Sequence, residues 1–314
     1  MKALVKFCNN YQLKLVSDPT LESHDDVLVK IKTSAICRTD QYVAQGLIDC
    51  EDNRVLGHEA SGTVISIGNE VNSISIDDQV IINPMKACYR CDDCLKQDYH
   101  HCSNIQFMGV DYDGTFAEYV VCPANQVYRF SDLSFEQAAY TEPIAATLAV
   151  VYSSIHDHKE ASIAVVGSGR IAQLTFQILA RSGYTNVQLI GLENLQKQTS
   201  EGAKFDYVVE SISTPNTATE DLFSCIRLLR TAGTLILKSR NPHPVQFPTM
   251  ELIKRRITIE SVYYAPFDEA IHFIENNLDL IDSLIGRSYP IEDHALAFHT
   301  ANQSEANKTF FIFK

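Results

Sequence analysis

Hydrophobic and polar positions follow two different rhythms along this chain. In the first third, short runs of alternating or β-branched apolar residues are separated by Gly, Asn and Asp, as in residues 27–36, 60–68, 78–84 and 116–130. Runs of this kind predict short strands joined by turns. We therefore expect a β-rich domain in this part of the chain.

The pattern changes near residue 145. The continuous apolar run 163–166 predicts a strand buried on both faces of a parallel sheet. The residues after it repeat at helical spacing and predict one apolar helix face, formed by Ile171, Leu174, Ile178 and Leu179. Further predicted strands lie at 205–211, 233–239 and 257–264, and predicted helices at 219–233 and 266–278. This alternation predicts an α/β domain with a doubly wound parallel sheet.

The turn between the first such strand and its helix reads Gly-x-Gly-x-x-Ala. Gly167 allows a tight turn, Gly169 lets a pyrophosphate approach the backbone, and the helix start offers free N–H groups to it. The placement between a buried strand and an amphipathic helix favours a dinucleotide site. A plain strand–helix turn is the alternative.

Composition narrows the class of protein. The 314 residues are enough for two domains, and 45% apolar with 21% charged residues is ordinary for a globular protein. The net charge of −13 argues against a nucleic-acid partner. No stretch reaches membrane-spanning length, and the N-terminus lacks the apolar core of a signal peptide. We expect a cytoplasmic protein without membrane contact.

Four of the nine cysteines fall within fifteen residues, at positions 88, 91, 94 and 102. In a reducing compartment, this spacing favours a metal site over disulfides. Four thiolates fill a closed, structural zinc site. An iron–sulfur cluster and chance clustering are the alternatives, and the lobe alone would also fit a zinc-ribbon interaction protein.

A second set of metal-ligating residues is spread over the chain. Cys37, His58, Glu59 and Glu142 offer the ligand types of catalytic zinc, which keeps one coordination position open. Taken singly, each of these residues has an ordinary structural explanation, such as a buried small cysteine or a hydrogen-bonded loop histidine.

Taken together, these motifs resemble the zinc-containing medium-chain alcohol dehydrogenases. The spacings from Cys37 to His58 and from His58 to Cys88 match that family, and Gly-His-Glu (57–59), residues 113–121 and Thr-Glu-Pro (141–143) follow in its order. The resemblance covers essentially the whole chain and is nearest to the sorbitol and threonine dehydrogenase branch.

The resemblance implies a fold and a domain division. It implies a GroES-like, β-rich catalytic domain of residues 1–144 and 280–314, and a Rossmann-type domain of residues 145–279. It also implies two zinc ions per chain, NAD or NADP as cofactor, a small alcohol or carbonyl substrate, and a homodimer or homotetramer. The reaction would be hydride transfer between a small alcohol, polyol or amino alcohol and the nicotinamide.

The resemblance also implies roles for individual residues. Catalytic roles fall on Thr39, which passes the alcohol proton, on Asp40, which holds the ligand imidazole, and on Glu59. The catalytic zinc ligands would be Cys37, His58, Glu59 and Glu142, and the structural ones Cys88, Cys91, Cys94 and Cys102. The cofactor would be held by Arg38, Gly167, Ser168, Gly169, Arg170, Ile171, Gly191 and Glu193.

Several positions depart from the family pattern. Tyr42 stands where a relay histidine is common, and Tyr89 and Gln97 stand where the cysteine lobe usually has glycines, so its turns must differ or tolerate strain. Only twenty residues, 191–210, occupy an interval that in the family holds a helix, a strand and another helix. We expect one short helix there and a missing or vestigial edge strand.

The cofactor preference is the last expectation. The second strand of an NAD site normally ends in an acid that binds the ribose hydroxyls and repels a 2′-phosphate. Here that position is Gly191, and Lys197 is the first cation after it. Glu193 could fold back to replace the missing acid, but an acid in a first helical turn is the more ordinary explanation. We expect weak discrimination between NAD and NADP. A zinc-free enone or quinone reductase of the same superfamily is the alternative activity.

Overall fold

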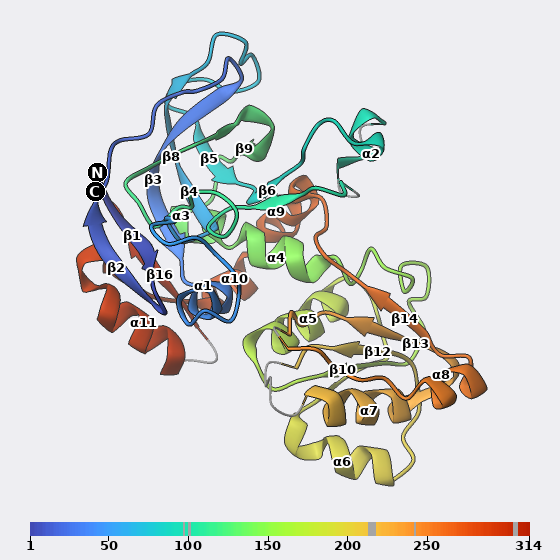
Figure 1. Cartoon of the computed structure of the whole chain (residues 1–314). Helices are drawn as coiled ribbons and strands as arrows, with labels where there is room; N and C mark the ends of the chain where they lie inside the picture. Colours follow the sequence, from blue (N-terminus) through green and yellow to red (C-terminus); the bar gives the residue numbers. More distant parts are fainter. Residues whose placement is uncertain (97, 100–101, 213–217, 242, 304–306) are drawn as a thin grey trace. The chain divides into compact units, whose positions relative to one another are not determined.

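The computed structural model describes residues 1–96, 98–99, 102–212, 218–241, 243–303 and 307–314 (Figure 1). The chain forms two compact units, one of residues 1–144 with 266–314 and one of residues 145–265. No helix in the described ranges has both the length and the apolarity to cross a membrane.

The first unit is β-rich, as its alternating pattern predicts. Its strands are β1 (Lys2–Phe7), β2 (Asn10–Leu15), β3 (Asp26–Ala35), β4 (Glu59–Ile67), β5 (Gln79–Ile82), β6 (Met85–Lys86), β7 (Gln106–Phe107), β8 (Tyr119–Pro123), β9 (Val127–Arg129), β15 (Ile285–Pro290) and β16 (Lys308–Ile312). Its helices are α1 (Arg38–Ala44), α2 (Asp92–Leu95), α3 (Phe135–Ala139), α4 (Thr141–Leu148), which runs on into the second unit, α9 (Phe267–Glu275), α10 (Leu278–Leu284) and α11 (His294–Gln303).

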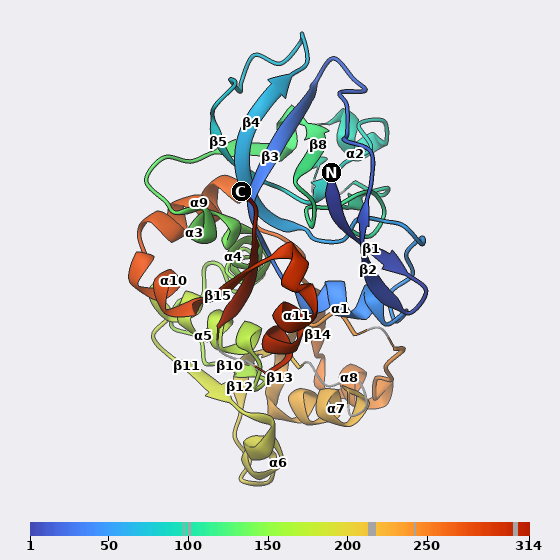
Figure 2. The ribbon, with the colours of Figure 1, turned by 90° about the vertical axis from the view of Figure 1, so that its left-hand side faces the viewer.

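One seven-stranded sheet organises this unit. Its order is β15-β16-β3-β4-β5-β9, with β8 also paired to β3. Strand β3 is central, and Val27, Val29 and Ile31 point alternately into the core, where each is fully buried. The C-terminal segment closes the sheet, because β16 pairs antiparallel with β3 and α11 packs on β15 and β16 (Figure 2).

The second unit is a parallel sheet of five strands in the order β11-β10-β12-β13-β14. Its elements are β10 (Ile163–Val166), α5 (Arg170–Arg181), β11 (Val187–Ile190), α6 (Leu192–Ser200), β12 (Phe205–Glu210), α7 (Ala218–Leu228), β13 (Leu229–Leu237), α8 (Thr249–Arg255) and β14 (Thr258–Ser261). Helix α5 covers one face, and α6 and α7 lie on the other (Figure 1). All four residues of β10 are buried, as its continuous apolar run predicts.

The short interval 191–210 folds as expected. It holds α6 and then β12, which pairs directly with β10, so β11 is the edge of the sheet. The predicted fold class, a GroES-like β-rich part with a doubly wound parallel sheet that lacks its third strand, is confirmed.

The predicted helix 219–233 is wrong at its C-terminal end. Helix α7 stops at Leu228, and β13 begins at Leu229, which pairs with Phe205 of β12. The guanidinium group of Arg255 donates to the carbonyl of Ile226, in the last turn of the helix, and to that of Leu229, the first residue of β13. The last turn thus has a hydrogen-bond partner outside the helix.

The division into functional domains remains a prediction. By packing, residues 266–279 lie in the first unit.

Candidate active site

The first candidate metal ligand lies at the start of a helix. Cys37 is the N-cap of α1, and its backbone N–H donates to the Asp40 carboxylate at 2.8 Å. The same carboxylate accepts from the backbone N–H of Gly57 at 3.1 Å. Asp40 therefore links the start of α1 to the loop that precedes β4, and this link brings Cys37 close to the Gly-His-Glu motif.

Asp40 also orients the histidine of that motif. Nδ1 of His58 lies 3.3 Å from Oδ1 of Asp40, and both side chains are buried. Nε2 of His58 is buried and has no hydrogen-bond partner. A carboxylate at one ring nitrogen with the other left open is the usual arrangement of a metal-binding imidazole. This geometry supports the role predicted for Asp40.

Glu59 forms a buried ion pair that the sequence did not indicate. Its Oε1 accepts from the Lys308 ammonium group at 2.6 Å, and both side chains are almost fully buried. Its Oε2 has no partner. Burial raises the pKa of Glu59 to about 8, although the Lys308 charge acts in the opposite direction. A buried carboxylate oxygen without a hydrogen-bond partner favours binding of a further cation at that atom.

Cys37, His58 and Glu59 meet in one place. Their ligand atoms all lie within 4.8 Å of one another. Burial would raise the pKa of Cys37, but the charges of His58 and Lys308 bring it down to about 6. A half-buried thiolate beside a buried imidazole nitrogen and a buried carboxylate oxygen fits a zinc ion with an open position. The chemistry of the donors and the lack of partners at His58 Nε2 and Glu59 Oε2 both favour a metal ion at this site.

The other predicted residues of this site lie around that group. Glu142, in the first turn of α4, is buried and close enough to Cys37 that its charge raises the pKa of the thiol, yet it is outside the group of three. The Thr39 hydroxyl lies 3.7 Å from the Cys37 sulfur. Arg38 is the first residue of α1.

Lys308 gives a testable consequence. Replacing Lys308 with Met leaves the Glu59 carboxylate buried without its cation, and breaking a buried pair on one side typically costs about 3–5 kcal/mol. We expect this loss in zinc-free protein and a smaller one in zinc-loaded protein, because the ion would compensate the carboxylate. Thermal unfolding with and without a chelator measures both. Lys308→Arg, which keeps the charge, is the control, and equal losses in the two states would contradict the prediction.

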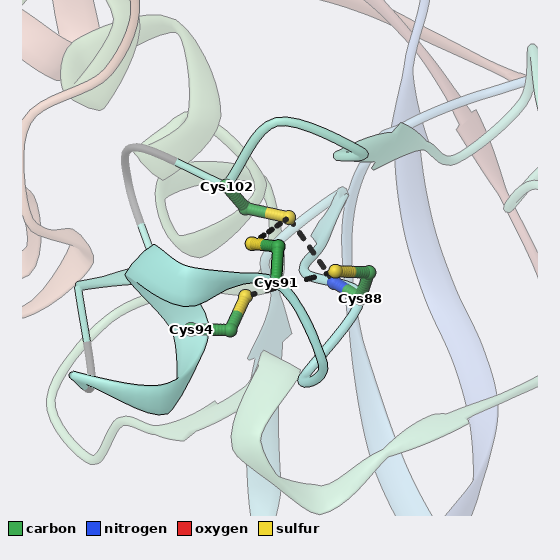
Figure 3. A group of neighbouring side chains, drawn as sticks. All are labelled: Cys88, Cys91, Cys94 and Cys102. Atoms are coloured by element: carbon green, nitrogen blue, oxygen red, sulfur yellow. Dashed lines mark hydrogen bonds between the residues drawn. The ribbon is translucent and has the colours of Figure 1, made fainter.

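The four-cysteine lobe forms a second, separate ligand group. The side chains of Cys88, Cys91, Cys94 and Cys102 converge from the two ends of the lobe (Figure 3). The Cys88 and Cys94 sulfurs are 3.9 Å apart, as are those of Cys91 and Cys102. Four Zn–S bonds of about 2.3 Å in a tetrahedron place the sulfurs ~3.8 Å apart. The spacing fits one tetrahedral ion, and this is the predicted structural zinc site.

The thiols of this lobe differ in their pKa values. Backbone N–H groups of Cys94 and Ser103 donate to Cys91 and lower its pKa to about 6, whereas desolvation and the neighbouring sulfurs raise the pKa of Cys94 to about 12.

Tyr89, at a position where the family usually has glycine, adopts a positive φ of 55°. The lobe therefore keeps the turn and accepts the strain. Gln97 lies outside the described residues.

The predicted dinucleotide turn lies at the carboxyl end of β10. A β-carbon on Gly167, whose φ is +150°, would lie 2.3 Å from the Ser211 carbonyl oxygen, so only glycine fits there. Gly169 is the N-cap of α5, and Arg170 and Ile171 begin that helix. The hydroxyl of Ser168 accepts from the backbone N–H of Leu192, which joins this turn to the start of α6.

Known proteins share these features. The sequence model of the alcohol dehydrogenase GroES-like domain matches residues 23–132. The sorbitol dehydrogenase of Halalkalibacterium halodurans is 26% identical, and the alignment covers 98% of each chain. The chain belongs to the zinc-containing medium-chain dehydrogenase family. The structure brings together Cys37, His58 and Glu59 and, separately, the four lobe cysteines, each as a group that could hold a metal ion, whereas Glu142 is outside the first group.

Solved structures show the same fold at low identity. A protein described as a zinc-binding dehydrogenase from Sinorhizobium meliloti 1021, with NADP bound, has a TM-score of 0.86 at 23% identity and covers 99% of each chain. An alcohol dehydrogenase of Escherichia coli CFT073, solved with NADH, has a TM-score of 0.87 at 21% identity and covers 100% of this chain and 99% of its own. Members of this medium-chain family are zinc-dependent, NAD(P)-linked alcohol and polyol dehydrogenases.

Proposed function

We propose that this chain is a zinc-dependent dehydrogenase that transfers a hydride between a small alcohol, polyol or amino alcohol and a nicotinamide dinucleotide. The observation that carries the proposal is the group of Cys37, which is half-buried, with the buried His58 and Glu59, in which His58 Nε2 and Glu59 Oε2 have no partner. A structural role would leave those atoms uncompensated, which is unfavourable for buried polar groups.

The chemistry divides between the bound groups and the chain. Zinc, when bound, would lower the pKa of an alcohol hydroxyl, and the dinucleotide would take up the hydride. Cys37, His58 and Glu59 would hold the zinc, and Asp40 would fix the imidazole through Nδ1. Thr39, whose hydroxyl lies 3.7 Å from the Cys37 sulfur, would pass the alcohol proton. Tyr42 replaces the usual relay histidine, so proton release would follow a different route.

The dinucleotide would lie at the carboxyl end of the parallel sheet. The turn of Gly167 to Gly169 supports binding of the pyrophosphate there, because the first N–H groups of α5 have no partner within the helix and could bind an anion. Arg170 begins the same helix. Arg38 remains proposed as a further pyrophosphate contact.

Metal content and a substrate panel test the proposal together. We expect two zinc ions per chain by elemental analysis, and reduction of NAD or NADP, followed by absorbance, with at least one member of a panel of alcohols, polyols and amino alcohols. One zinc with no turnover would favour the zinc-ribbon alternative. No zinc, with reduction of enones or quinones, would favour the reductase alternative.

Substitutions of Glu59 and Glu142 are expected to differ in their effect on zinc content and kcat. Glu59→Ala should lower zinc occupancy or reduce kcat by about 10–100-fold, the scale seen when groups around a catalytic metal are removed. Glu142→Ala should have the smaller effect, because its carboxylate lies outside the ligand group. Zinc content and kcat are the measurements. Unchanged values for both in the double variant would rule out a metal-directed role for either carboxylate.

A further inference from the structure

The carboxyl end of β11 lacks an acid in the strand but has one beside it. Ile190 ends the strand, Gly191 caps α6, and Glu193 is the second residue of that helix. The Glu193 side chain folds back over Gly191. A β-carbon built on Gly191 would lie 2.2 Å from Glu193 Oε1 and 2.6 Å from its carboxyl carbon. The carboxylate therefore fills the space that a side chain at position 191 would occupy.

Hydrogen bonds hold the carboxylate toward the glycine turn. The Ser168 hydroxyl, within that turn, lies 3.4 Å from Glu193 Oε2, and the Asn194 amide donates to Oε1 at 2.9 Å. The backbone N–H of Leu192 donates to the same Ser168 hydroxyl at 3.1 Å. Each carboxylate oxygen has two lone pairs, so both oxygens keep capacity for a ligand hydroxyl.

The cation of this helix points elsewhere. Lys197 lies one turn further along α6 and is within 3.9 Å of Glu201, toward the C-terminal end of the helix. The Glu193 charge at the end of β11 is therefore not paired with Lys197. A 2′-phosphate at this place would meet a carboxylate, whereas ribose hydroxyls would meet an acceptor.

We propose that Glu193 replaces the missing strand-end acid, accepts hydrogen bonds from the adenine-ribose hydroxyls, and makes the protein selective for NAD over NADP. The proposal rests on the proposed dinucleotide site. It revises the expectation of weak discrimination, which followed from Gly191 at the usual place of the acid and from the ordinary explanation of Glu193 as an acid in a first helical turn. The acid would then come from the second residue of α6, two positions after the usual strand-end position 191, with its carboxylate in the space beside Gly191.

Direct binding tests the proposal without turnover. The zinc-loaded full chain is titrated with NADH and with NADPH, and Kd is measured from nucleotide fluorescence. We expect NADH to bind about 100-fold more tightly, the scale expected when a phosphate–carboxylate repulsion takes the place of a hydrogen bond. Glu193→Gln, which keeps the shape, should bring the two Kd values within about tenfold of each other. Glu201→Gln, at the other end of α6, is the matched control and should leave the ratio unchanged.

A rescue variant separates this role from a structural one. In Glu193→Ala the space over Gly191 is free, so Gly191→Asp in that background should restore the NADH preference. An unchanged ratio in Glu193→Gln, or a wild-type protein that binds both nucleotides equally or prefers NADPH, would overturn the inference and leave the proposed function standing. Binding of neither nucleotide would overturn the proposed function, and this inference with it.

Discussion

Cys37→Ser and His58→Ala are each expected to abolish turnover, with kcat reduced by more than ~10³-fold. Each variant removes one donor from the group of three, and the remaining two donors cannot hold a tetrahedral ion firmly. Zinc content should fall from two ions to one per chain. The fold should persist, because Cys37 and His58 lie just before α1 and β4. These elements are held by other interactions, α1 by its helix hydrogen bonds and β4 by its pairing with β3 and β5.

Elemental analysis, circular dichroism and kcat on the same preparations provide the measurement. Cys8→Ser is the matched control, because Cys8 is an exposed cysteine that belongs to neither ligand group. It should retain both zinc ions and full activity. A Cys37→Ser protein that kept two zinc ions and normal kcat would contradict the assignment of this site.

The parts of the molecule predicted correctly from sequence are those whose residues lie close together in the sequence. The four lobe cysteines lie within fifteen residues, so their spacing alone indicates a common ligand set. The glycine turn lies between a strand and a helix that both have clear apolar patterns. The missing edge strand followed from a count of residues, because 191–210 is too short for more than one helix before β12.

Lys308 could not be predicted in the same way. It pairs with Glu59 across 249 residues of sequence, and a lysine that begins an apolar strand gives no sign of its partner. The pairing depends on β16 joining the sheet beside β3, with β4 on the other side of β3. The only signal in the sequence is a charged residue two positions before the apolar run Phe310–Phe313.

Glu193 illustrates a different limit. Its position in a first helical turn was clear from sequence, and an acid is ordinary there. Sequence does not give the direction of a side chain. In the structure the chain bends at Gly191, and the absence of a β-carbon there leaves space that the Glu193 carboxylate enters. The same glycine that removes the strand-end acid therefore makes room for its replacement.

Cys94→Ser is expected to reduce stability rather than act on the chemistry directly. Cys94 is buried in the lobe, with its sulfur 3.9 Å from that of Cys88, and it shares the structural zinc site with three other thiols. Zinc binding at such a site contributes folding free energy, because the unfolded chain has no preformed site. We expect loss of one zinc ion and a melting temperature lower by roughly 5–15 °C, which corresponds to a few kcal/mol for a unit of this size.

Differential scanning calorimetry with zinc analysis measures this effect, and Cys8→Ser again provides the control. Activity of freshly prepared Cys94→Ser protein at low temperature should survive in part, because Cys37, His58 and Glu59 are a separate group. Activity should then decay faster than in the wild type as the lobe unfolds. A fully stable Cys94→Ser protein that kept two zinc ions and had no activity would contradict the division into one structural and one catalytic site.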